Sequence, residues 1–113
     1  MPTSVKIPLM DKEAKLKLLK TKVEFVNSLL EKVDWEALRQ WREETLMILD
    51  NLIDEESKYY KNFEKIGYRS GVLSMMDPEG NRRRDEEAYV SGLQKAKSSL
   101  NAILYGIEQG LLI

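Results

Sequence analysis

The chain has 113 residues, of which 42% are hydrophobic and 33% charged, and its formal net charge at pH 7 is −1. This length suits one domain with a single core, and this balance of apolar and charged residues is typical of a globular protein. Because the sequence has no histidine and no cysteine, it excludes disulfides, thiolate metal sites and imidazole-based catalysis. We therefore expect no catalytic residue, cofactor or metal, although a carboxylate- or Mg²⁺-dependent activity stays formally open.

The first ten residues differ in character from the rest of the chain. Pro2 and Pro8 forbid a regular helix there, and the segment lacks the long apolar stretch of a secretory signal. We predict an extended arm over residues 1–10 and a single domain over residues 11–113. The expected location is the cytoplasm, with no association with a membrane.

Helical periodicity dominates the first half of the domain. Apolar residues recur at alternating spacings of three and four between Leu16 and Val33, which predicts a long first helix capped by Asp11. Asp34 is well suited to cap a second helix that ends near Ile53. The chain should therefore turn sharply near Asp34.

Two further helices are predicted in the second half. Acidic residues 54–56 suit the start of a short third helix, which Gly67 can end. Asp85 is expected to cap a last helix that keeps heptad spacing and reaches about Gln109. The pattern predicts an all-α fold, an up-and-down bundle of about four helices.

Residues 68–84, between the third and fourth helices, are predicted to form an irregular loop or a short hairpin. The segment combines an apolar stretch, a turn signal at residues 77–80 and a run of three arginines. It could fold over the open end of the bundle or bind a partner. The candidate partner-binding residues are Val72, Leu73, Met75, Met76, Arg82, Arg83 and Arg84.

Binding of a nucleic acid or a nucleotide through the arginine loop is the alternative function. Arginine presents a planar fork of donors that suits phosphate. Acidic residues flank the triplet on both sides, however, and the pI of about 5.6 opposes binding to nucleic acid. Aromatic residues that could stack on a base occupy core positions of their helices, so we expect an aromatic core instead.

A row of small residues follows one side of the last helix. Gly92, Ser99 and Gly106 are spaced by sevens, which indicates close approach by another helix, from this chain or from a partner. The first helix also carries Leu18, Phe25 and Leu29 beside its main apolar seam. This surplus of apolar surface favours self-association, most simply as a symmetric homodimer, or binding to another protein.

A pattern of mostly core positions extends from about residue 35 to residue 107. It consists of Trp41, Thr45, Leu49, Ser57, Phe63, Ile66, Gly67, Tyr68, Tyr89, Val90, Ser91, Gly92, Leu93, Ala96, Leu100 and Ile103. This pattern is similar to that of small helical modules that accompany TIR-like nucleotide-binding effectors in bacterial defence, or to that of related prophage and uncharacterised proteins. The resemblance implies a recognition or oligomerisation unit without catalysis of its own. We therefore expect a non-catalytic protein-interaction module, an adaptor or a regulator.

Overall fold

The computed structural model describes residues 11–71 and 75–112. The arm predicted over residues 1–10 lies outside the described residues, as do Val72 and Leu73. The described chain contains helices and no strand, so the predicted all-α fold is confirmed. The helices are α1 (Lys12–Glu31), α2 (Trp35–Asp50), α3 (Lys58–Glu64) and α4 (Pro78–Glu108).

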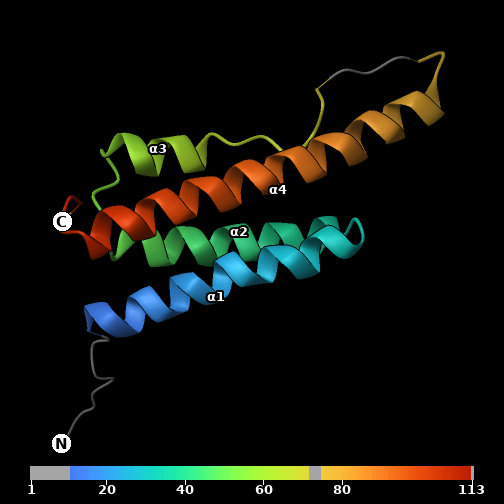
Figure 1. The fold of residues 1–113 in the computed structure, drawn as a ribbon. Helices are drawn as coiled ribbons and strands as arrows, with labels where there is room; N and C mark the ends of the chain where they lie inside the picture. The colour runs from blue at the N-terminus through green and yellow to red at the C-terminus, as the bar shows by residue number, and fades with distance from the viewer. Residues whose placement is uncertain (1–10, 72–74, 113) are drawn as a thin grey trace, which may run out of the picture.

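The four helices alternate in direction along one long axis (Figure 1). Helix α1 packs against both α2 and α4, while α3 packs on the far side of α4. The molecule is elongated, with extents of 62 × 33 × 24 Å, and the N-terminal end of α4 projects beyond the other helices. This arrangement is the predicted up-and-down bundle.

The predicted caps of the first two helices are confirmed. An Oδ1 atom of Asp11 accepts a hydrogen bond of 2.8 Å from the amide of Ala14, and Asp34 accepts one of 3.0 Å from the amide of Ala37. Each carboxylate satisfies an amide that has no partner within its own helix. The short connection over residues 32–34, which Asp34 ends, returns α2 along α1.

Helix α4 begins at Pro78, inside the segment predicted to be a loop or hairpin. Asp77 is its cap and accepts a hydrogen bond of 2.9 Å from the amide of Gly80, while Pro78 takes the first helical position. An aspartate followed by proline suits a turn and a helix start equally well, since proline lacks the amide that a first helical residue leaves unpaired. Residues 82–84 are therefore helical, and Asp85 lies inside the helix and does not cap it.

The core joins side chains from all four helices. Complete burial of each large apolar side chain contributes about 1.5–3 kcal/mol. Trp41 is buried between α1 and α3: its Nε1–H donates to the carbonyl of Lys22 at 2.9 Å, and its ring meets Phe63 edge-on at 6.1 Å. The fully buried residues include Leu19, Val26, Trp41, Leu49, Phe63, Tyr89, Leu93, Ala96, Leu100 and Ile103.

Tyr89 links three elements through its hydroxyl. The hydroxyl donates to the carbonyl of Leu29 at 2.7 Å, near the end of α1, and accepts from the amide of Asp34 at 3.3 Å, at the start of α2. The ring packs edge-on against Trp35, with centroids 5.1 Å apart. Burial raises the pKa of Tyr89, so the hydroxyl stays protonated and able to donate.

Tyr68 presents the opposite case. Its side chain is buried against α4, yet its hydroxyl has no hydrogen-bond partner within the described part of the chain. Burial raises the pKa of Tyr68 to about 12. A buried polar atom without a partner costs about 1–3 kcal/mol, so the ring stabilises the fold while the hydroxyl opposes it.

These two tyrosines provide a matched pair of substitutions. We expect Tyr89→Phe to lower the free energy of unfolding by about 1–2 kcal/mol, because it leaves a buried carbonyl without its donor. Tyr68→Phe should leave stability unchanged or raise it by about 1 kcal/mol, because it removes an unpaired group. Urea denaturation followed by circular dichroism measures both. Equal losses in the two variants would contradict the hydrogen bonding described for Tyr89.

Candidate functional site

The described residues form no grouping suited to metal-dependent chemistry. Among residues 11–71 and 75–112, no three acidic side chains converge closely enough to hold a metal ion. Hydrogen bonds from Lys22 and Gln40 hold the pKa of Glu44 below its usual value, so this carboxylate is in an ordinary ion pair. Buried Thr45 donates its hydroxyl to the carbonyl of Trp41 at 2.7 Å, within its own helix. The Lys22–Glu44 pair joins α1 to α2, and the Thr45 hydroxyl is satisfied within α2.

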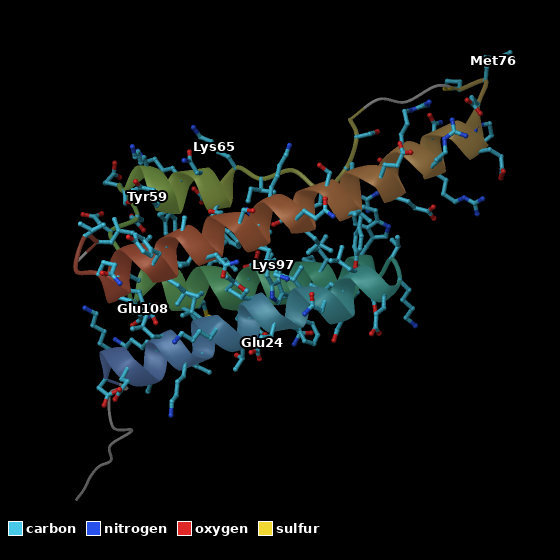
Figure 2. All side chains as sticks on the ribbon, in the orientation of Figure 1. Glu24, Tyr59, Lys65, Met76, Lys97 and Glu108 are labelled. Atoms are coloured by element: carbon cyan, nitrogen blue, oxygen red, sulfur yellow. The ribbon has the colours of Figure 1, made fainter. Side chains whose placement is uncertain are left out.

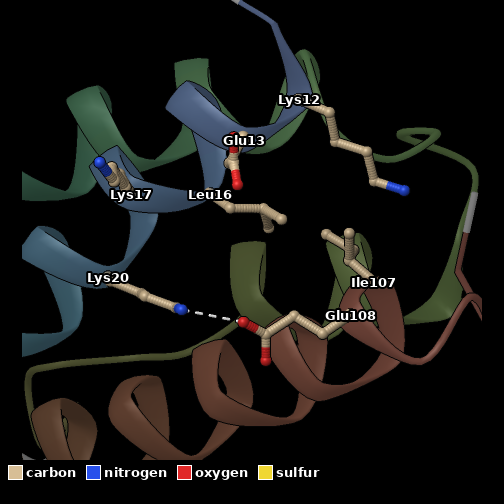
Figure 3. Close-up of a pocket in the computed structure, with 7 residues that line it drawn as sticks. All are labelled: Lys12, Glu13, Leu16, Lys17, Lys20, Ile107 and Glu108. Atoms are coloured by element: carbon tan, nitrogen blue, oxygen red, sulfur yellow. Dashed lines mark ion pairs between the residues drawn. The ribbon is translucent and has the colours of Figure 1, made fainter.

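A hollow of about 420 Å³ lies between the start of α1 and the end of α4 (Figure 3). Leu16 and Ile107 supply its apolar side chains, and Lys20 pairs with Glu108 across it at 2.9 Å. Both partners of this ion pair are about half exposed, so water screens the pair and its contribution stays below about 1 kcal/mol. The ammonium groups of the other lining lysines do not point toward one another. The hollow therefore lacks converging groups that would grip a small ligand.

The three consecutive arginines do not form one basic surface. Successive residues of a helix are rotated by about 100°, so the three side chains leave α4 in different directions. Arg82 pairs with Glu79 at 3.2 Å, and Arg84 hydrogen-bonds to the side chain of Asn81. Arg83 is exposed and forms no ion pair with any residue that the structure describes. The three guanidinium groups therefore lie in three different environments and do not converge on one site.

Two predicted partner-binding residues, Met75 and Met76, lie at the projecting tip of the molecule. Their exposed fractions are 90% and 91%, and Figure 2 places Met76 at the far end beside the start of α4. Because Val72 and Leu73 lie outside the described residues, the apolar surface known at the tip consists of the two methionines. Exposed apolar side chains beside a charged helix are typical of contact surfaces.

Sequence reasoning missed the outer face of α4, which we define as Arg83, Glu86, Glu87, Val90, Ser91 and Gln94. These residues line a shallow groove of about 390 Å³ on a side of the helix that turns away from the core. Val90 is 37% exposed in the middle of this face. Most of these residues lie inside the predicted helix, but they are mainly charged or polar, so no apolar stripe marked the face in the sequence.

A second feature missed from the sequence holds the projecting end in place. The guanidinium of Arg69 lies 3.9 Å from the centroid of the Trp35 ring and 3.7 Å from a carboxylate oxygen of Asp85. The amide of Ser70 also donates to Asp85 at 3.0 Å. These contacts fasten the connection after α3 onto α4. They fix the orientation of the helix just behind its exposed tip.

The two glycines of this row in α4 allow other segments of the same chain to approach the helix closely. A Cβ atom at Gly92 would lie 2.6 Å from the carbonyl oxygen of Gly67 and 2.5 Å from Tyr68 Cδ1. A Cβ atom at Gly106 would lie 2.8 Å from Leu112 Cδ1. Ser99, between them, is half-buried. The close neighbours of the two glycines are therefore non-helical segments of this chain.

No protein-family model, no curated protein and no solved structure matches this chain. What the chain does must therefore follow from its own surfaces. Two of them combine exposure with defined geometry: the methionine tip and the outer face of α4.

The two glycines should respond differently to alanine. Gly92→Ala is expected to lower the free energy of unfolding by about 1–3 kcal/mol, because the new methyl group meets a backbone carbonyl that cannot retreat without moving the chain. Gly106→Ala meets the flexible end of Leu112 and gains up to about 1 kcal/mol of helix propensity, so its net effect should be near zero. Thermal unfolding of both variants tests this difference. A Gly92→Ala variant as stable as the unmodified chain would contradict the close approach of residue 67.

Proposed function

We propose that this chain is a non-catalytic helical module for protein interaction and oligomerisation, acting as an adaptor or a regulator. The observation that carries the proposal is the projecting end of α4. In this fully described stretch from Pro78 to Ala88, only Gly80 is buried, and its cover is the side chain of the capping Asp77. Short isolated helices are marginal in water, and this end is held in shape by the rest of α4 and by the contacts of Asp85. An exposed helix end of defined orientation supports a role in binding another protein surface.

The charges on this end favour a protein partner over a nucleic acid. Residues 77–87 carry five acidic and three basic side chains, so the projecting end has a net negative charge. Nucleic-acid interfaces are strongly positive. A mixed pattern of charges next to exposed methionines instead suits a protein surface with matching charges.

The cellular setting is proposed from the resemblance alone. Helical modules that accompany TIR-like effectors suggest a function in bacterial defence or in a prophage, within the cytoplasm. Within the part of the chain that the structure describes, no helix has the length and apolar character to cross a membrane. An adaptor in such a system would act by bringing copies of itself or of a partner together.

Self-association is the first prediction of this proposal. We expect the average mass in sedimentation equilibrium to rise from the 13.1 kDa of the monomer toward twice that value between about 10 and 500 μM, a range that spans micromolar dissociation constants. A chain that stays monomeric over the whole range would contradict oligomerisation.

Weak binding to nucleic acid is the second prediction. At physiological salt we expect no complex with DNA or RNA tighter than about 10 μM, far weaker than typical specific complexes. Fluorescence anisotropy of labelled oligonucleotides measures this, with the Arg82→Ala, Arg83→Ala, Arg84→Ala triple variant as the control. Sub-micromolar binding that the triple variant abolishes would establish the alternative function.

A further inference from the structure

We propose that two copies of this chain pair antiparallel along the outer face of α4, about a two-fold axis near Asp85, with Arg83 of each copy facing Glu86 and Glu87 of the other. The inference rests on the proposed self-association and assigns it a surface and a partner, a second copy of the same chain.

The order of charges along the helix is the first argument. Residues 82–84 are three arginines and residues 85–87 are three acids. When this segment is laid antiparallel beside its own copy, every arginine stands opposite an acid and every acid opposite an arginine. A two-fold interface places the same patch of both copies in contact, so the patch must be complementary to itself. This segment meets that condition.

Only three of the six charged side chains lie on the outer face of α4. Arg83, Glu86 and Glu87 share the outer face, because they are three and four residues apart. All three are exposed, and none forms an ion pair with a residue that the structure describes. The side chain of Asp85 points to the opposite side, where it binds Arg69 and Ser70. The axis can therefore pass over Asp85 without bringing two carboxylates together.

Pairing within one helix is a poor alternative for these charges. Arg83 stands before Glu87 at a spacing of four, which is the less favourable order for an ion pair within a helix. Glu79 stands before Arg83 in the favourable order, but its carboxylate already pairs with Arg82 at 3.2 Å. In an antiparallel neighbour the acids of the second copy lie beside Arg83.

Apolar side chains flank the charged centre in a matching way. Val90 lies on the outer face about 8 Å along the helix from the proposed axis, and the exposed Met75 and Met76 lie on the other side of it. Rotation about the axis brings Met76 of one copy to the level of Gln94 of the other, and Val90 to the level of Gly80. The interface therefore has a charged centre flanked on each side by uncharged side chains.

The size of this contact sets its strength. Two helices that touch over a few turns bury less than the roughly 800 Å² per partner of stable complexes. We expect a dissociation constant in the range of about 10–100 μM that increases as salt screens the central charges. A dimer of this strength responds to the local concentration of the chain.

Charge exchange between two variants tests the pairing. Arg83→Glu makes the outer face wholly acidic, and Glu86→Arg with Glu87→Arg makes it wholly basic. Each variant alone should associate at least tenfold more weakly than the unmodified chain, whereas an equimolar mixture should form a heterodimer. Lys65→Glu is the matched control, because it makes the same change of charge at an exposed position next to the end of α3 and should leave association unchanged. Sedimentation equilibrium measures all four samples, and circular dichroism checks that each variant is folded.

A distance measurement provides a readout that changes no charge. The chain has no native cysteine, so Ser98→Cys, at an exposed position of α4, gives a unique attachment point for a nitroxide label. With the axis near Asp85, the two labels of a dimer should lie about 40 Å apart, from the helical rise of 1.5 Å per residue and a helix spacing of 8–10 Å. Pulsed electron paramagnetic resonance measures this distance.

The outcomes separate this inference from the proposed function. If the unmodified chain dimerises and the charge variants dimerise equally well, the α4 pairing is wrong but self-association stands. A label distance far from about 40 Å leads to the same conclusion. Weakened single variants that form no heterodimer on mixing also overturn the α4 pairing. An unmodified chain that stays monomeric up to about 500 μM overturns both, whatever the variants do.

Discussion

The hydroxyl of Tyr89 is the contact on which the position of α4 depends. The last carbonyls of α1 have no partner within their helix, and α1 has no basic residue in its last turn and no glycine at its C-cap. Tyr89 donates to one of these carbonyls and accepts from the first amide of the following turn. A residue of α4 thus completes the end of α1 and the start of α2. This fixes both the distance between the helices and the register of α4 along them.

A chain of side-chain contacts extends from Tyr89 toward the projecting end. The tyrosine ring supports Trp35, Trp35 carries the guanidinium of Arg69, and Arg69 pairs with Asp85. The two contacts that involve α4, at Tyr89 and Asp85, use its inner side, so the opposite side remains available. The internal packing of the bundle therefore determines which residues of α4 face outward, and the charges on that outward side are the ones available to a second molecule.

Features that depend on neighbours in sequence could be predicted, and features that depend on distant contacts could not. Asp11 and Asp34 were expected as caps because a cap is a local hydrogen bond. The sequence places the start of α4 too late, at Asp85 instead of Asp77, because residues 77–80 satisfy the pattern of a turn as well as that of a helix start. Asp85 resembles a cap in sequence, and only the folded chain shows that its carboxylate binds residues 69 and 70. The outer face of α4 was missed because most of its side chains are polar, and only the folded chain shows that Arg83 joins them on one side of the helix.

The brevity of α3 has a consequence for the motions of the molecule. This helix has seven residues, and its buried side chains are Tyr60 and Phe63, whereas α4 buries side chains along most of its length. Local opening of a folded chain requires least free energy where few apolar groups are buried. Helix α3 can therefore detach as a cooperative unit while α1, α2 and α4 stay assembled around Tyr89. Amide hydrogen exchange in the layer that covers Trp41 would then be faster than in the buried part of α4 from Tyr89 to Ile107, and each opening would expose an aromatic surface on the flank away from the methionine tip.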